Sequence, residues 1–141
     1  MTAYTHLALP SVPDMAPKFG FESVMEARFA TGSLDCEQTG LAYFHIKPGQ
    51  RQFAHRHGEQ EELYVVLAGS GRARMDDEVI AVTTLDAIRV APATRRAFEA
   101  GPDGMQLLAF GTPAMSDGEN DAELLQGEDA AWPGDPGPTP S

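Results

Sequence analysis

The middle of the chain, from Leu41 to Phe110, is a series of short, largely apolar segments separated by glycine, aspartate and proline turns. In residues 72–75 and 87–91 polar and apolar residues alternate with the period of half-buried strands. The predicted strands cover residues 41–47, 62–68, 72–75, 78–82, 87–91 and 105–110. The turns predicted between them include Pro48-Gly49, Gly69-Ser70-Gly71, Asp76-Asp77 and Gly101-Pro102-Asp103-Gly104. Because no long helical pattern separates these segments, the sequence predicts an all-β fold, an antiparallel sandwich or barrel.

The two ends of the chain differ from this middle region. Residues 1–40 form a predicted irregular arm, in which Pro10, Pro13 and Pro17 prevent a helix from running through residues 1–23. Within the arm, residues 25–29 are predicted as a short strand or a turn of helix. Residues 112–141 form an acidic tail with five prolines, a composition that favours flexibility. Trp132 and the Leu124-Leu125 pair are its predicted anchors, on the barrel or on a partner chain. The chain is therefore predicted to be one domain, with residues 41–111 as its barrel.

Net charge and cysteine content restrict the partners and the compartment. The formal net charge is −11, with 10 basic and 21 acidic residues. Nucleic acids and anionic membranes both require a basic surface, so neither is an expected partner. No apolar run reaches the length of a membrane span, and the N-terminus lacks the pattern of a secretory signal. With Cys36 as its one cysteine, the protein is expected in a reducing cytoplasm.

Two histidines in the middle region carry the strongest chemical signal. His55 and His57 are two residues apart, so both imidazoles leave the same face of an extended strand. A turn at Gly58 would let the next strand return and bring a carboxylate beside them. The carboxylates in reach are Glu59, Glu61 and Glu62. Two imidazoles and one carboxylate suit a divalent iron, manganese, nickel or zinc ion with coordination positions left open. Alone, such a histidine pair is more often found at a surface, but its place between a Pro-Gly turn and an apolar strand favours a metal site.

The spacing around these histidines resembles the first motif of the cupin superfamily, in its small single-domain form with a cupin 2 conserved barrel. The motif reads glycine, five residues, His-x-His, four residues, glutamate, six residues, glycine, and it matches Gly49 through Gly69. The resemblance covers about residues 41–110. It implies a jelly-roll barrel with a ligand pocket, metal ligands at His55, His57 and Glu62, and pairing of two chains as a homodimer.

The second cupin motif is altered in this chain. Members of the family have glycine, five residues, proline, one residue, glycine, two residues, histidine, three residues and asparagine. The corresponding stretch here runs from Leu85 to Ala100, with Leu85 in place of the first glycine and Arg96 in place of the histidine. The remaining replacements are Ala91, Ala93 and Ala100. The fourth protein ligand of a metal is therefore absent, which weakens the expected metal binding.

Arg96 allows three interpretations. A guanidinium stays protonated and has no lone pair for a metal. Arg96 could bind a substrate carboxylate or phosphate in the pocket, which is the ligand-binding role that we predict. It could instead pair with Glu62 and leave a metal-free pocket. It could also be a surface residue beside Arg95.

Three functions follow from these alternatives. The first is a metal-dependent oxygenase, lyase or isomerase acting on a small anionic metabolite. The second is a non-catalytic, metal-free pocket that binds an anion through Arg96. The third is a structural or interaction protein that uses its acidic tail. The sequence assigns no catalytic residue.

Overall fold

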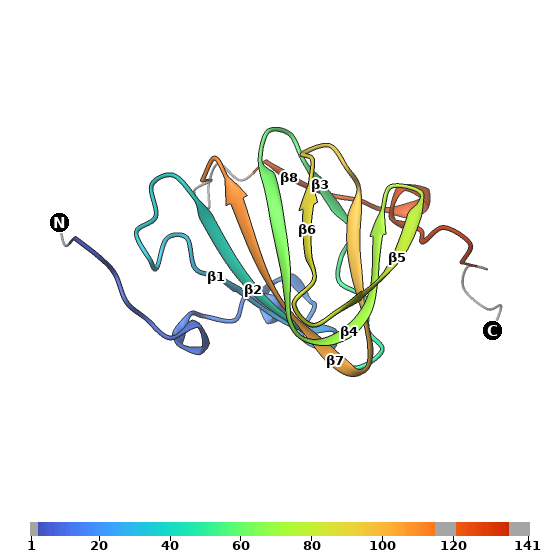
Figure 1. Cartoon of the computed structure of the whole chain (residues 1–141), viewed down its shortest axis with the longest axis horizontal. Helices are drawn as coiled ribbons and strands as arrows, with labels where there is room; N and C mark the ends of the chain where they lie inside the picture. The colour runs from blue at the N-terminus through green and yellow to red at the C-terminus, as the bar shows by residue number, and fades with distance from the viewer. Residues whose placement is uncertain (1–2, 115–120, 136–141) are drawn as a thin grey trace.

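The computed structural model describes residues 3–114 and 121–135 of the chain. Residues 1–2, 115–120 and 136–141 lie outside the described residues, and with them part of the predicted arm and tail. Within the described part, eight strands form one sheet that curls into a half-barrel (Figure 1). The predicted all-β, jelly-roll class is confirmed. None of the helices in these ranges has both the length and the apolar character needed to span a membrane.

The elements follow the order that the turns of the sequence suggest. The strands are β1 (Met25–Phe29), β2 (Gly40–Ile46), β3 (His55–His57), β4 (Glu61–Met75), β5 (Glu78–Thr83), β6 (Ala87–Val90), β7 (Arg96–Thr112) and β8 (Ala122–Leu124). The short helices are η1 (Leu9–Ser11), α1 (Ala16–Phe19) and η2 (Gly127–Ala130).

The long strand β7 organises the sheet, because it pairs with three other strands. It runs antiparallel to β2, with Phe44 opposite Leu107, and antiparallel to β4, with Tyr64 opposite Ala109. At its start, Arg96 lies opposite His55 of β3. The motif strands β3 and β4 are therefore both held against β7, and β8 closes the outer side of β3.

Two of the predicted turns are wrong, because they lie inside long strands. Residues 69–71 belong to β4, and residues 101–104 belong to β7. The two segments face each other, and the register between the strands shifts on either side of residue 69. A Cβ atom on Gly69 would collide with the carbonyl oxygen of Gly104, and one on Gly71 would collide with that of Glu99. These glycines permit a close approach of two backbones where the paired strands bend, rather than a chain reversal.

The N-terminal arm packs along the barrel. Met25–Phe29 is a strand, the first of its two predicted alternatives. The prolines leave room for only one turn of α-helix, Ala16–Phe19, in which Pro17 occupies the first turn, where a missing N–H costs nothing. Asp14 Oδ1 accepts hydrogen bonds from the backbone N–H groups of Ala16 and Ala27, at 3.0 and 2.9 Å. This carboxylate thereby ties the short helix α1 to β1.

The main core fills the inside of the half-barrel with alternate residues from β2, β4 and β7. Its largest buried members are Tyr64, Phe98, Met25, Ile46, Met105, Leu107 and Val66. A second, smaller cluster joins Ala54, Ala97 and Trp132. This cluster links the barrel to the C-terminal segment.

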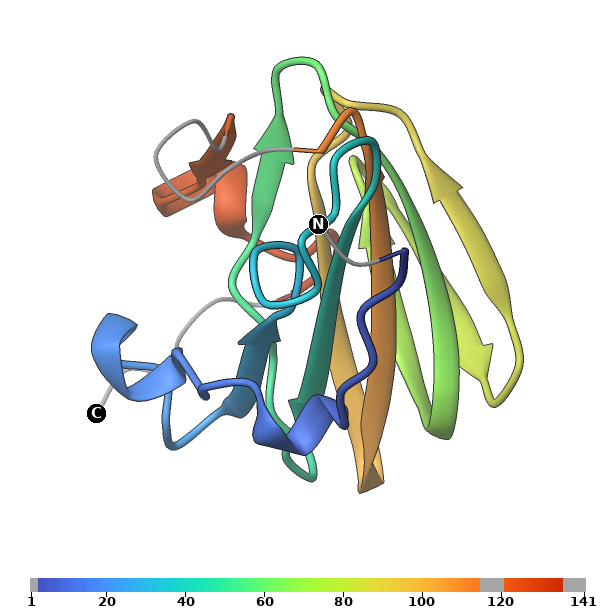
Figure 2. The ribbon, with the colours of Figure 1, turned by 90° about the vertical axis from the view of Figure 1, so that its left-hand side faces the viewer.

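The described part of the tail docks on the barrel of its own chain. Strand β8 pairs with β3 (Figure 2), and Trp132 is only 6% exposed. The guanidinium groups of Arg51 and Arg72 lie 4.7 and 5.4 Å from the Trp132 ring centroid. Of the two leucines predicted as anchors, Leu125 packs against the second cluster and Leu124 is exposed. Residues 121–135 are therefore part of the folded domain.

Candidate metal centre

The turn between β3 and β4 brings the three predicted metal ligands to one place. The strand period puts His55 and His57 on the inner face of β3, where both are buried, and Glu62 is buried at the start of β4. Glu61 points the other way, and its half-exposed carboxylate pairs with Arg89 at 3.3 Å. Glu59 is also exposed. Of the three glutamates that the sequence offers, only Glu62 reaches the histidines.

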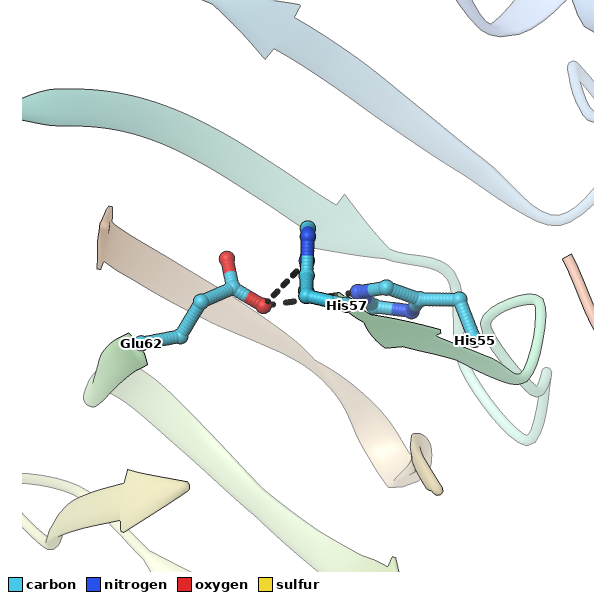
Figure 3. A group of neighbouring side chains, drawn as sticks. All are labelled: His55, His57 and Glu62. Carbon is cyan, nitrogen blue, oxygen red and sulfur yellow. Dashed lines mark hydrogen bonds and ion pairs between the residues drawn. The ribbon is translucent and has the colours of Figure 1, made fainter. Parts of the chain in front are cut away.

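One carboxylate oxygen lies at the centre of this group. Oε1 of Glu62 is 3.0 Å from Nε2 of His57 and 3.4 Å from Nε2 of His55 (Figure 3). The Tyr64 hydroxyl donates a hydrogen bond of 2.6 Å to the same oxygen. One ligand atom from each of His55, His57 and Glu62 lies within 4.8 Å of the other two. That spacing is close enough for one ion to contact all three.

Arg96 lies directly behind this group. It is fully buried, at 0% exposure, so the interpretation as a surface arginine is wrong. Its Nη1 donates to the carbonyl oxygens of Pro92 and Thr94 at 2.9 and 2.6 Å, and its Nη2 is 3.3 Å from Oε1 of Glu62. The guanidinium is therefore held by backbone carbonyls and faces the central carboxylate.

Burial and charge act differently on the three candidate ligands. Burial lowers the pKa of His55, and the nearby Glu62 carboxylate only partly offsets this. Burial also opposes the charged form of His57, but Glu62 and then Asp121 raise its pKa overall. Burial would raise the pKa of Glu62, but the two adjacent imidazoles hold it well below its usual range. Glu62 is thus an ionised carboxylate at neutral pH, as a metal ligand must be.

A divalent cation fits the donor set. The Nε2 atom of His57 is buried and makes no hydrogen bond, although it lies 3.0 Å from a carboxylate oxygen. Nδ1 of His57 lies 2.8 Å from a carboxylate oxygen of Asp121, and with the ring proton there a lone pair at Nε2 faces a lone pair of Glu62, which is repulsive. A shared cation would satisfy both atoms, and two nitrogens and one oxygen suit zinc or a first-row transition metal. Arg96 acts against this fit, because its positively charged guanidinium already pairs with the Glu62 carboxylate, at 3.3 Å.

Two residues that contact the candidate ligands, Tyr64 and Asp121, were not predicted from the sequence. Tyr64 is two residues after Glu62, so the strand period already placed it on the same face, but an aromatic residue there is more often core. Asp121 gave no signal at all, since it is one of several carboxylates in an acidic tail. Its Oδ1 lies 2.8 Å from Nδ1 of His57 across 64 residues of chain.

An apolar cavity of about 550 Å³ opens beside the candidate ligands. His55, His57, Glu62 and Tyr64 form its polar end. Its walls include Phe21, Phe29, Phe44 and Phe53, and the rings of Phe21 and Phe53 stack at a centroid distance of 5.3 Å. Lys18 of α1 adds a cation, so the N-terminal arm forms part of the cavity wall. Arg96 is not among the residues that line this cavity.

Comparisons with known proteins agree with this architecture. Residues 42–110 match the family model described as "Cupin domain". No curated protein is significantly similar to the chain in sequence. Among solved structures, a cupin protein from Bacteroides fragilis is 24% identical with a TM-score of 0.66, and the match covers 82% of this chain and 89% of that one.

Two further structures share the fold at lower identity. A variant of oxalate decarboxylase from Bacillus subtilis is 18% identical with a TM-score of 0.72, over 89% of this chain but only 33% of the decarboxylase. A variant of the Streptomyces protein PAC13, solved with uridine, is 16% identical with a TM-score of 0.67, over 86% and 90% of the two chains. The family match, the fold and the intact first motif together show that this chain belongs to the cupin superfamily, with residues 42–110 as its cupin domain.

Proposed function

We propose that this protein binds a divalent iron, manganese, nickel or zinc ion through His55, His57 and Glu62 and acts on a small organic anion, as an oxygenase, lyase or isomerase. One observation carries the proposal. All three donor side chains line the same cavity of about 550 Å³. This volume is in the usual range for small-molecule sites, about 300–1,000 Å³. A ligand in the cavity would therefore be in direct reach of the ion.

The protein residues have distinct tasks in such a site. A divalent ion held there would act as a Lewis acid on a coordinated oxygen atom of the substrate. Tyr64 donates to Oε1 of Glu62 and so fixes the orientation of this carboxylate. The phenylalanine walls, including the stacked Phe21 and Phe53, exclude water from the polar end and contact the apolar part of a substrate.

The charges around the site favour an anionic substrate. Glu62 and Arg96 neutralise each other at 3.3 Å. Asp121, which contacts His57, then contributes one negative charge near the ion. A divalent ion would exceed this negative charge by one positive charge. Buried charges are stable only when they are paired. A substrate carboxylate or phosphate would supply the missing negative charge, and Lys18 on the cavity wall would add a second attraction.

A metal-free binding pocket is the second candidate, and the position of Arg96 is the observation that favours it. Nη2 of Arg96 is 3.3 Å from Oε1 of Glu62, and Tyr64 already donates to that oxygen. With both partners in place the carboxylate is compensated without an ion. In this case the cavity would bind an anion without catalysis. A structural role alone would be supported by a collapsed pocket, and the open cavity gives it no such support.

Metal analysis separates the two candidates. Protein purified without chelators is analysed for bound metal, and metal-free protein is titrated with Mn²⁺, Fe²⁺, Ni²⁺ and Zn²⁺ by calorimetry. The proposal predicts about one ion per chain, lost in His57→Ala and retained in the control His45→Ala, whose ring is 40% exposed and lies outside the cluster. Trace metal only and no measurable affinity would overturn the proposal.

A thermal-shift screen with small carboxylates and phosphates then tests the ligand class. Stabilisation that disappears on addition of a chelator supports the metal-dependent function. Stabilisation that is unchanged by a chelator supports the metal-free pocket instead.

A further inference from the structure

Asp121 contacts the candidate metal ligand His57 on the side away from Glu62. Its Oδ1 lies 2.8 Å from Nδ1 of His57, and its side chain is only 21% exposed. A carboxylate at neutral pH can only accept hydrogen bonds, so Nδ1 must carry the proton. In the neutral ring the lone pair is then on Nε2, which is the nitrogen that faces Glu62 at 3.0 Å. Only this tautomer can offer Nε2 to an ion.

The second oxygen of Asp121 holds the turn that connects the metal-binding strands. Oδ2 accepts hydrogen bonds from the backbone N–H groups of Glu59 and Gln60, at 2.5 and 3.1 Å. These residues lie between His57 at the end of β3 and Glu62 in β4. One carboxylate therefore fixes both the ring of His57 and the backbone that sets the distance from His57 to Glu62.

The C-terminal segment holds Asp121 in place independently of the site. Directly after Asp121, the strand β8 pairs with β3, with Ala122 opposite His57 and Glu123 opposite Arg56. Further along, Trp132 is buried against Ala54 and Ala97. The position of Asp121 is therefore determined by the docking of the whole segment 121–135, which lies outside the matched cupin domain of residues 42–110.

We propose that Asp121 is a positioning residue that selects the Nδ1–H tautomer of His57, so that the C-terminal segment completes the metal centre built by β3 and β4. The metal half of this inference rests on the proposed function. The tautomer half concerns the metal-free protein and can be tested without any ion. Carboxylates that hold metal-binding histidines in this way typically change metal affinity by about 10–100-fold when they are removed.

The variant Asp121→Asn provides a sharp test because an amide has only one acceptor. Two backbone N–H groups point at one end of the side chain, and one imidazole nitrogen lies at the other. The amide oxygen would face the two N–H groups, so its NH₂ group would donate to Nδ1 of His57. The ring proton would then move to Nε2, which blocks metal binding at that nitrogen while the shape of the side chain is kept.

The tautomer is read by long-range ¹H–¹⁵N NMR of metal-free protein at alkaline pH, where His57 is neutral, with its signals assigned by their loss in His57→Ala. The expected result is Nδ1–H in the wild type and Nε2–H in Asp121→Asn. An Nε2–H ring in the wild type would overturn the inference, and so would an unchanged tautomer in the variant. Because the wild-type spectrum is decisive alone, the test survives a variant that fails to fold.

The same variants are titrated with Zn²⁺ and Mn²⁺. Asp121→Asn is expected to bind about 10–100-fold more weakly than the wild type. The matched control is Glu123→Gln on the same strand, whose exposed carboxylate pairs with Arg56 at 3.0 Å, and its affinity is expected to stay within about twofold of the wild type. Equal weakening in both variants would show that docking of the segment, not the Asp121 contact, matters, and would overturn the inference. A wild type that binds no metal contradicts the proposed function only, since the tautomer still decides the role of Asp121.

Discussion

The two motif regions of this barrel carry side chains of opposite charge at the candidate metal centre. The first, residues 49–69, brings three donor side chains together and ends at Gly69, with a φ of 85°. The second, residues 85–100, begins at Leu85, which keeps a φ of 72° although it replaces a glycine. At the position of the missing histidine, Arg96 still lies opposite His55 in the register. The backbone that forms the barrel is therefore separable from the side chains that bind a metal.

This difference changes the charge balance of the site. In the first region Glu62 supplies a buried negative charge, and in the second Arg96 supplies a buried positive one at 3.3 Å. A fourth neutral ligand would have left the negative charge for the metal alone. Here the carboxylate has two competing cationic partners, and a metal ion must share it with Arg96.

The largest expected effect comes from breaking the link between the two regions. Arg96→Met keeps most of the side-chain volume but leaves Glu62 buried without its cationic partner. We expect the metal-free protein to lose about 3–5 kcal/mol in its free energy of unfolding, as measured by chemical denaturation. The double variant with Glu62→Gln should recover at least half of this loss. Additive losses in the double variant would show that the two side chains do not interact.

Acidification weakens the same pair by protonating Glu62. Since the pKa of Glu62 is lowered in the folded protein, its ionised form contributes stability above the unfolded pKa of about 4.3. That contribution is lost as the pH falls toward the lower folded pKa. Relative to Glu62→Gln, the wild type should lose up to about 1.4 kcal/mol per pH unit below that point. The exposed Glu61→Gln variant is the control, and an equal pH dependence there would contradict the assignment to Glu62.

The glycine that ends the first motif should be intolerant of a side chain. Gly69→Ala places a Cβ atom against the carbonyl oxygen of Gly104 at a residue with a positive φ. We expect a loss of about 2 kcal/mol or more in the free energy of unfolding. The control is Gly32→Ala, where a Cβ would have no atom within 4 Å. A loss at Gly69 no larger than at Gly32 would contradict the close approach of β4 and β7.

Restoring the missing histidine ligand should strengthen metal binding. Arg96→His removes a positive charge and returns an imidazole to the strand position opposite His55. We expect metal affinity to rise at least about tenfold by calorimetry, which corresponds to about 1.4 kcal/mol. The neighbouring Arg95→His is the matched control, because Arg95 points outward and pairs with Asp76 at 3.4 Å. An affinity unchanged in Arg96→His would mean that Arg96 does not compete with the ion.

The smallest effect is expected where the second region has lost its glycine. Leu85 is 79% exposed, so its side chain contributes little packing while its backbone stays in the left-handed conformation. Leu85→Gly should gain about 0.5–1 kcal/mol in thermal or chemical unfolding, because relief of the left-handed strain exceeds the entropy cost of glycine. Leu85→Ala keeps the Cβ atom and should stay near the wild type. A destabilised Leu85→Gly would contradict this account.

Local pattern was enough to predict the half of the site that lies within one hairpin. Residues two apart on a strand share a face, which is a property of the chain alone. The resemblance to the cupin motif then selects Glu62 among three glutamates. The same local reasoning misread residues 69–71 and 101–104 as turns. Glycine is required both for chain reversal and for close strand contact, and only the pairing of β4 with β7 shows which of the two applies.

The sequence by itself determined the all-β barrel, the two histidines with their glutamate and the altered second motif, because these depend on strand period and short spacing. Only the tertiary structure decided that Arg96 is buried against Glu62 and that Asp121 lies on His57. Both contacts join residues 34 or more positions apart, and the acidic tail offers several equivalent carboxylates. Strand pairing and the docking of Trp132 bring the partners of these two contacts together. Both depend on the packing of the whole chain rather than on any local pattern.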